Sequence, residues 1–169
     1  MVILETSKGR IALELDHEQA PLTSANFEQY VRDGFYEGLI FHRVISNFMI
    51  QTGGFDSDMQ PRRPREAIQN EADNGLSNMR GTVAMARTMS PHSASSQFFI
   101  NVNDNGFLDH TAKTSEGWGY AVFGRVAEGM DVVDTIRELP TTRRAGHSDV
   151  PEENVVIEKA WITDEQDSQ

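Results

Sequence analysis

The connections between the β-rich runs are the sequence feature that most constrains the fold. Most of these connections are too short to hold the crossover helix that a pair of parallel strands needs. The runs cover residues 2–6, 10–15, 39–51 (two runs), 82–86, 97–102, 120–124 and 155–162. This pattern predicts about seven or eight short antiparallel strands, arranged as a barrel or a sandwich.

Two stretches have helical rather than strand periodicity. We expect a first helix over residues 21–32, because Phe27, Tyr30 and Val31 recur at helical spacing. A second helix should precede Pro140, with its apolar face formed by Val132, Val133, Ile136 and Leu139. Residues 52–81 show neither periodicity, and a stretch of that length within a domain usually forms a functional loop region.

The length of 169 residues predicts a single domain, which we place at residues 1–163. Residues 164–169 form an acidic tail that is expected to fray. The chain contains no cysteine, which excludes disulfides, thiolate nucleophiles and cysteine-ligated zinc. We therefore expect a core that folds without covalent or metal cross-links.

The formal net charge of −11 disfavours binding to a phosphate backbone, so we expect no nucleic-acid partner. No apolar run exceeds four residues, whereas a membrane span takes about 20, and we expect no signal peptide before the first strand. These features predict a cytoplasmic protein, and we also expect it to be a monomer. We interpret the arginine clusters at residues 62–65 and 143–144 as solvated loop charges.

Signatures of metal, nucleotide and hydrolase sites are missing from the sequence. The five histidines, at positions 17, 42, 92, 110 and 147, lack the close spacing of a metal site. Neither a nucleophile-elbow motif nor a phosphate-binding loop occurs. We predict no metal and no cofactor, although a scattered Ser/His/Asp triad stays open on the sequence alone.

Residues 41–51 alternate polar and large apolar side chains. Arg43, Met49 and Gln51 share parity, so a continuous strand would place them on one face. The simpler alternative is a core stripe with Arg43 as a surface charge. A second cluster comprises residues 85–87, 95–101 and 107–109, where the adjacent Phe98 and Phe99 must face opposite sides of a strand.

These residues give the chain a close resemblance to the cyclophilin family of peptidyl-prolyl cis/trans isomerases, in particular its cytoplasmic bacterial branch. The resemblance rests on residues 41–45, 53–54, 96–100 and 122–124, in this order, and extends over nearly the whole chain. It implies a fold dominated by β-structure, namely a closed eight-stranded antiparallel β-barrel capped by two α-helices.

The resemblance also assigns roles to residues. Arg43 matches the catalytic arginine of the family, and Gln51 matches a polar residue that supports the arginine and the substrate. The remaining positions match substrate-binding residues: Phe48, Met49, Phe99 and Leu108 in a proline pocket, together with Ala86, Arg87, Gln97, Phe107 and Tyr120. Where many eukaryotic members carry a Trp, this chain has Phe107, which implies weak binding of cyclosporin.

The implied reaction is rotation about X-Pro peptide bonds in unfolded or partly folded proteins. An arginine that donates to the prolyl nitrogen stabilises the twisted bond and needs neither a base nor a cofactor. Two alternatives stay open on the sequence. One is a proline-peptide binding module or holdase chaperone with incidental turnover, and the other is a small-ligand barrel resembling a lipocalin.

Overall fold

The computed structural model describes residues 1–163, so the predicted acidic tail lies outside the described residues. Its helices and strands follow the chain in the order β1 (Val2–Thr6), β2 (Gly9–Leu15), α1 (Pro21–Arg32), β3 (Leu39–Ile45), β4 (Met49–Asp56), β5 (Thr82–Met85), β6 (Phe98–Asn101), β7 (Val122–Glu128), α2 (Met130–Arg137), β8 (Thr141–Arg144), β9 (His147–Pro151) and β10 (Ile157–Ile162). Two short 3₁₀ turns, Ala72–Asn74 and Gly106–Leu108, lie in the longer connections.

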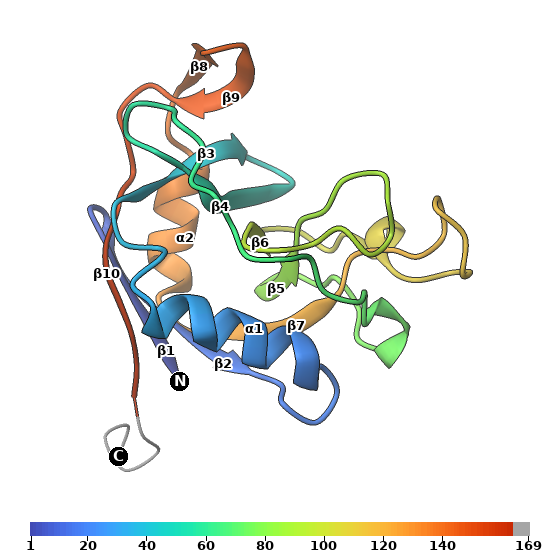
Figure 1. The fold of residues 1–169 in the computed structure, drawn as a ribbon. Coiled ribbons are helices and arrows are strands. Elements are labelled where there is room, and N and C mark those ends of the chain that lie inside the picture. Colours follow the sequence, from blue (N-terminus) through green and yellow to red (C-terminus); the bar gives the residue numbers. More distant parts are fainter. Residues whose placement is uncertain (164–169) are drawn as a thin grey trace.

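Eight strands form one antiparallel sheet in the order β10-β1-β2-β7-β5-β6-β4-β3 (Figure 1). Its two edges approach each other, because the amide N–H of Phe41 donates to the carbonyl of Val155 at 3.0 Å and that of Gly38 donates to Ile157 at 2.8 Å. The sheet is thus a nearly closed barrel, which leaves few strand edges unpaired. The prediction of an eight-stranded antiparallel barrel with two helices is confirmed.

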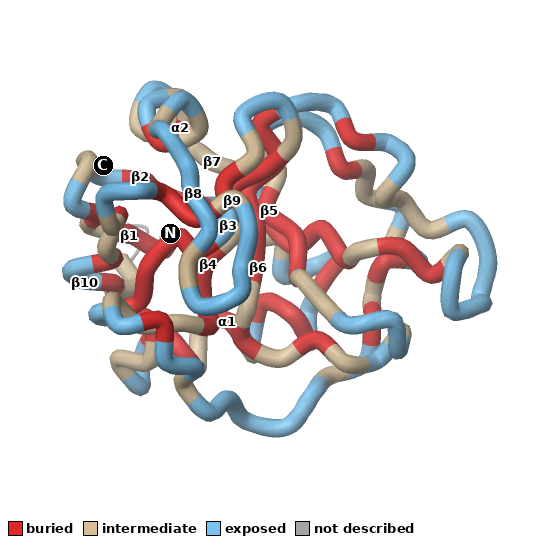
Figure 2. The backbone as a smooth tube through the Cα atoms, turned by 90° about the horizontal axis from the view of Figure 1, so that it is seen from above, coloured by how far each residue is buried: buried red, intermediate tan, exposed pale blue. Residues whose placement is uncertain are grey.

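One apolar cluster fills the barrel and joins it to both helices. Phe27 of α1 packs against Phe98 of β6 and Phe123 of β7, with ring centroids 5.0 and 5.2 Å apart. Val133 and Ile136 of α2 belong to the same cluster. In Figure 2 the buried residues concentrate along the strands, whereas the long connections are mostly exposed or intermediate. The helices are therefore held by burial of one face against the sheet.

The structure corrects several element boundaries. The strand β4 continues to Asp56, so the irregular region begins later than residue 52. The strand β7 begins at Val122 and extends to Glu128, beyond the expected run of residues 120–124. Both extensions pair with neighbouring strands, whose hydrogen bonds compensate for a weak local pattern.

The hairpin formed by β8 and β9 was not predicted. Figure 1 shows it projecting from the end of the molecule next to β3. Three of the four residues of β8 are exposed, so this strand lacks the apolar alternation that identifies a half-buried strand. Val150 of β9 is fully buried beside Ile40 and Met59, and this contact anchors the hairpin to the barrel.

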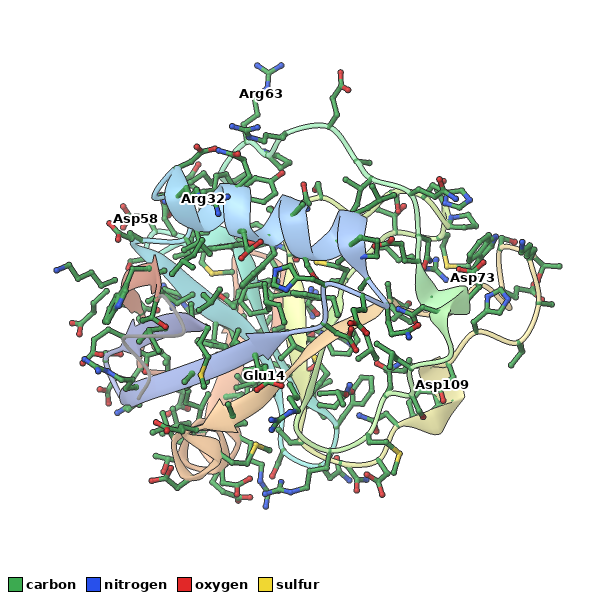
Figure 3. The ribbon with its side chains drawn as sticks, turned by 90° about the horizontal axis from the view of Figure 1, so that it is seen from below. Glu14, Arg32, Asp58, Arg63, Asp73 and Asp109 are labelled. Atoms are coloured by element: carbon green, nitrogen blue, oxygen red, sulfur yellow. The ribbon has the colours of Figure 1, made fainter. Side chains whose placement is uncertain are left out.

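The interpretation of the arginine clusters as solvated charges is wrong for two of their members. Arg62 donates to the backbone carbonyls of Phe35 and Glu37 at 2.8 and 2.7 Å. Arg144 donates to the carbonyl of Ser57 at 3.2 Å. Arg63, in contrast, is exposed and points away from the fold in Figure 3. Within residues 1–163, no helix is long and apolar enough to cross a membrane.

Candidate functional site

A cavity of about 210 Å³ opens on the surface where β3, β4, β5 and β6 meet the 3₁₀ turn at 106–108. Nine of the eleven site residues expected from the sequence line it: Arg43, Phe48, Met49, Gln51, Ala86, Arg87, Phe99, Leu108 and Tyr120. These residues come from five separate parts of the chain. The fold therefore brings the two sequence clusters together into one groove.

The floor of this cavity is apolar. Met49 and Phe99 are buried in a small cluster that also contains Ala84 and Val122. Phe98, the neighbour of Phe99, points to the opposite side and enters the barrel core, as the alternation of a strand requires. The two phenylalanines thus serve different regions, one filling the barrel and the other forming the base of a slot for a small apolar group.

Three polar side chains form a hydrogen-bonded line that begins at one wall of the cavity. Arg43 and Gln51 are cross-strand partners in the β3–β4 hairpin, and the Arg43 guanidinium donates from Nη1 to Gln51 Oε1 at 3.4 Å. The amide of Gln51 donates in turn to Gln97 Oε1 at 2.9 Å. This relay leaves Arg43 exposed but restrains its orientation, so that the guanidinium borders the apolar floor.

The position of Gln97 depends on the glycine pair at 53–54. A Cβ atom on Gly54 would collide with the side-chain amide of Gln97. Gly53 has a φ of +100°, and a Cβ there would lie 2.6 Å from the carbonyl oxygen of Ser96. Only glycine allows β4 to approach the 95–97 segment this closely without strain. The pair therefore lets Gln97 reach Gln51.

Buried amides hold the rim of the cavity. Asn105 Nδ2 donates to the carbonyl of Phe48 at 2.9 Å and to Asn101 Oδ1 at 2.8 Å. These bonds tie the β3–β4 turn to the segment before the 3₁₀ turn. Phe107, which the resemblance assigns to substrate binding, is not among the residues that line the cavity. It stacks on Phe48 with centroids 5.7 Å apart and is 76% exposed, because the 3₁₀ turn directs it outward.

Arg87 separates the cavity from a second one of about 230 Å³. Its Nε donates to the carbonyl of Gly119 at 2.9 Å, its Nη1 donates to the carbonyl of Thr88 at 2.8 Å, and its guanidinium lies over the ring of Tyr120. Gln97 lines this second cavity and not the first. The other residues that line it are Gln51, Ala86, Arg87, Thr88, Ser93 and Ser95.

Sequence reasoning missed Thr88 and Ser93, and it placed Ser95 in the second cluster without giving it a role. They lie in a serine-rich segment that has the composition of an ordinary connection, and no periodicity sets it apart. The position of this segment opposite Gln51 is a tertiary feature. The only local signal is its proximity in the chain to Arg87 and Gln97, two residues that the resemblance had already selected.

The ionisable groups around the groove differ in their surroundings. Neither Arg43 nor Arg87 forms an ion pair with a carboxylate of residues 1–163. Burial acts to raise the pKa of Asp109, but hydrogen bonds from Ser77 and Asn78 outweigh it and lower that pKa. Asp109 therefore stays ionised and anchors the segment that carries Leu108.

His42 lies on the face of β3 opposite Arg43. It packs against Phe55 and His147, with ring centroids 4.7 and 6.5 Å away, and its Nδ1 has no hydrogen-bond partner among the described residues. Burial, then the charges of His147 and Arg43, lower its pKa to about 4. His42 is therefore neutral at pH 7 and is not a group of the groove.

The residues that line the groove suit hydrogen-bond donation rather than acid–base chemistry. The two cavities are lined by arginines, amides, hydroxyls and apolar groups, without a histidine or a carboxylate. In the described part of the chain, no three His, Asp or Glu side chains gather as a metal site would require. The groove can thus bind an apolar ring and present a fixed cation beside it.

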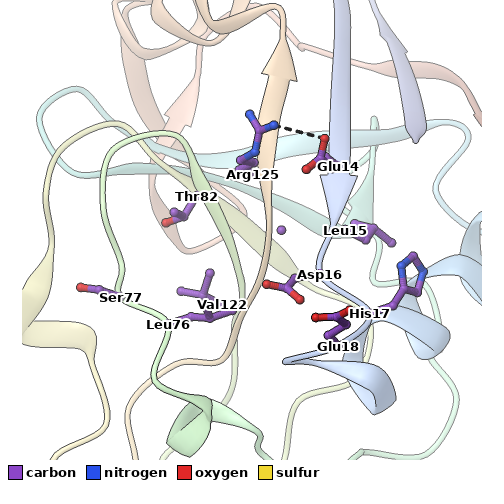
Figure 4. Close-up of a pocket in the computed structure, with 11 residues that line it drawn as sticks. Glu14, Leu15, Asp16, His17, Glu18, Leu76, Ser77, Thr82, Val122 and Arg125 are labelled. Carbon is purple, nitrogen blue, oxygen red and sulfur yellow. Dashed lines mark hydrogen bonds and ion pairs between the residues drawn. The ribbon is translucent and has the colours of Figure 1, made fainter. Parts of the chain in front are cut away.

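A further cavity of about 500 Å³ lies at the end of β2, beside the turn that precedes α1 (Figure 4). Glu14, Asp16 and Glu18 line it together with Arg125 and the apolar side chains of Leu76 and Val122. None of the predicted site residues takes part. Its carboxylates distinguish it from the groove around Arg43.

Comparisons with known proteins agree with this geometry. The family described as "Cyclophilin type peptidyl-prolyl cis-trans isomerase/CLD" matches residues 1–162. Peptidyl-prolyl cis-trans isomerase cyp18 of Streptomyces antibioticus is 63% identical over 161 residues, covering 95% of this chain and 97% of that protein. Peptidyl-prolyl cis-trans isomerase B of Escherichia coli (strain K12) is 51% identical over 164 residues, covering 97% of this chain and 100% of that protein.

A solved structure is similar over nearly the same length. The cyclophilin type peptidyl-prolyl cis-trans isomerase of Cryptosporidium parvum, crystallised in the presence of the dipeptide Ala-Pro, superposes with a TM-score of 0.79 at 25% sequence identity. The match covers 96% of this chain and 98% of that chain. The similarity in sequence and the similarity in fold therefore indicate the same family.

Proposed function

Because the chain belongs to the cyclophilin-type peptidyl-prolyl cis-trans isomerases, we propose that its activity resides in the groove between Arg43 and Leu108. The family membership makes the chain an isomerase of X-Pro peptide bonds and excludes the small-ligand carrier that the sequence left open. The observation that supports this location is the convergence of Arg43, Met49 and Phe99 on one cavity.

In this proposal the proline ring occupies the apolar slot. Met49 and Phe99 form its floor, and Phe48, Leu108 and Tyr120 form its sides. A ring held on one side leaves the acyl group before the proline free to turn. Rotation about an X-Pro bond crosses a barrier of roughly 18–20 kcal/mol, because the amide loses its partial double-bond character. The slot thus fixes one end of the bond that must rotate.

Arg43 supplies the stabilisation of the twisted bond. When resonance is lost, the lone pair returns to the prolyl nitrogen, which becomes a hydrogen-bond acceptor. A guanidinium is charged at every physiological pH and can donate to that nitrogen while Gln51 restrains its position. A rate gain of about 10⁵ needs about 7 kcal/mol, to which a charge-assisted hydrogen bond and the fixed geometry both contribute.

Three finer properties belong to the same proposal. Cyclosporin should bind weakly, because the exposed Phe107 offers an aromatic surface but no N–H donor. The substrates are X-Pro segments of unfolded or partly folded proteins. The cytoplasmic location and the monomeric state stay predictions from the sequence.

Replacement of Arg43 tests the assignment. In a refolding assay limited by proline isomerisation, Arg43→Ala should lower kcat/KM by about a hundredfold or more, because one charged donor to the developing lone pair is lost. Arg125→Ala is the matched control, since it removes an exposed guanidinium from β7, outside the groove. Its kcat/KM should equal that of the wild type.

Circular dichroism should show that both variants keep the fold, since Arg43 and Arg125 are exposed. Turnover by Arg43→Ala at the wild-type rate would overturn its assigned role. Addition of a chelator in excess should leave wild-type turnover unchanged.

A further inference from the structure

The groove carries two positive charges, Arg43 and Arg87, and neither is paired with a carboxylate of residues 1–163. The chain contains 26 acidic residues, and two of its other cavities reflect this: Glu14, Asp16 and Glu18 line one of them, and Asp33 and Glu37 line another. The two adjoining cavities of the groove contain no Asp or Glu in their walls. The two arginines would therefore attract a negatively charged ligand to the groove, although the net negative charge of the protein repels such a ligand.

Arg87 stands in the wall that the two cavities share. Two of its five N–H donors are used, one by the carbonyl of Gly119 and one by the carbonyl of Thr88. These bonds, with the ring of Tyr120 at 4.6 Å, fix the plane of the guanidinium while other N–H groups stay available. A fixed arginine loses little conformational entropy when it binds a carboxylate.

The two cavities adjoin, so one extended peptide could occupy both. Gln51, Ala86 and Arg87 line both, so they are direct neighbours. With a proline in the apolar cavity, the next one or two residues on one side must pass Arg87, because an extended chain advances about 3.3–3.6 Å per residue. The second cavity has space for a side chain, and its walls offer hydroxyl and amide groups from Ser95 and Gln97.

From this arrangement we propose that Arg87 makes the enzyme select X-Pro segments that carry an aspartate or glutamate within two residues of the proline, on the side that enters the second cavity. The proposal rests on the proposed function, since it requires the proline to occupy the apolar cavity. The selecting contact is a hydrogen-bonded ion pair between the substrate carboxylate and the Arg87 guanidinium.

Matched peptides test this selectivity. Each peptide contains one X-Pro bond and either Glu or Gln at one position, placed one or two residues before the proline in one series and after it in the other; X is Ala unless the Glu or Gln occupies that position. Exchange NMR gives kcat/KM without a coupled protease. We expect the Glu peptide of one series to exceed its Gln counterpart by about three- to tenfold, the range of a partly exposed charged hydrogen bond.

Three variants locate the effect. Arg87→Gln should bring the Glu-to-Gln ratio close to one, and Arg87→Lys should retain a ratio above one because it keeps the charge. Arg125→Gln changes the net charge as much as Arg87→Gln but lies in β7, outside the groove, so its ratio should match the wild type. The ratio should also shrink when salt is raised from about 0.01 M to about 0.3 M, as charges are screened.

Two results would overturn the proposal: equal rates for Glu and Gln peptides in both series, or a Glu preference that Arg87→Gln leaves unchanged. The Gln peptides distinguish a failure of this selectivity from a failure of the proposed function. Their turnover by the wild type measures isomerisation alone, so a missing preference with normal turnover refutes only the selectivity.

Discussion

The groove around Arg43 and the cavity around Glu14 share an apolar foundation but differ in charge. Leu76 and Val122 line the Glu14 cavity and pack in the same cluster as the floor of the groove. In that cavity, Arg125 is paired with Glu14 at 3.1 Å (Figure 4). In the groove, Arg43 has an amide as its neighbour, at 3.4 Å.

This difference shows that the side chains beside an arginine decide whether its charge is available to a ligand. A guanidinium beside a carboxylate is already satisfied, and at an exposed site such a pair contributes little to stability. A guanidinium beside neutral donors and acceptors keeps its charge available for a ligand. The same side-chain type therefore serves the surface at Arg125 and, in our proposal, the chemistry at Arg43.

The largest effect should come from a buried group that would have to become a cation on protonation and whose Nδ1 has no hydrogen-bond partner among the described residues. His42, one residue from Arg43, is buried, and its pKa is lowered to about 4 by burial first and then by His147 and Arg43. Because its folded pKa lies below its unfolded pKa, the unfolded chain binds more protons between about pH 6.5 and 4. The contribution of neutral His42 to the free energy of unfolding is therefore complete above about pH 6.5 and is lost as the pH falls toward about 4.

Denaturant unfolding from pH 7.5 to 4 measures the loss, which should approach about 3 kcal/mol at the acid end. The comparison is with His42→Leu, which cannot titrate, so the stability of the wild type should fall more steeply than that of the variant. Parallel pH profiles for the two proteins would show that His42 is protonated in the folded state without cost.

A second test concerns Phe107, the exposed aromatic side chain that stacks on Phe48 beside the groove. Among residues 1–163, no aromatic side chain of this kind lines the Glu14 cavity. Phe107→Trp adds an N–H donor at a position that is 76% exposed and stacks on Phe48. Cyclosporin should bind the variant more tightly by about 1–3 kcal/mol, or about five- to a hundredfold, because a ligand carbonyl gains a partner. Calorimetric titration of both proteins gives the two Kd values.

Isomerisation of short peptides should change much less in this variant, since Phe107 does not line the cavity. Equal affinities of wild type and Phe107→Trp for cyclosporin would mean that the drug does not contact this position.

The smallest effect is expected where charges are already paired. Glu14→Gln breaks the exposed pair with Arg125 and should lower the free energy of unfolding by only about 0.2–1 kcal/mol. Peptide turnover should equal that of the wild type, because the guanidinium released there lies outside the groove. A change of kcat/KM beyond experimental error would show that the two regions are coupled through their common apolar cluster.

The sequence by itself determined the features that depend on local periodicity. The helix α1 was predicted with its observed bounds, and the strands at β1 and β2 were placed almost to the residue. The shared parity of Met49 and Gln51 gave their common face, because side-chain direction alternates along a strand whatever the rest of the chain does. Arg43 shares that face because the β3–β4 hairpin pairs it with Gln51. The roles of these residues came from the family resemblance, not from the pattern.

Tertiary structure decided the features whose partners are distant in the chain. The helix α1 has no side-chain cap of its own, and Glu71 fulfils this function by accepting from the N–H of Thr23 at 2.7 Å, 48 positions away. Burial of Val150 anchors the unpredicted hairpin of β8 and β9. The contact between Gln97 and Gln51 depends on the barrel bringing β4 beside β6. Periodicity indicates which face of a helix or strand is buried. Which residues pack against that face depends on the tertiary fold of the whole chain.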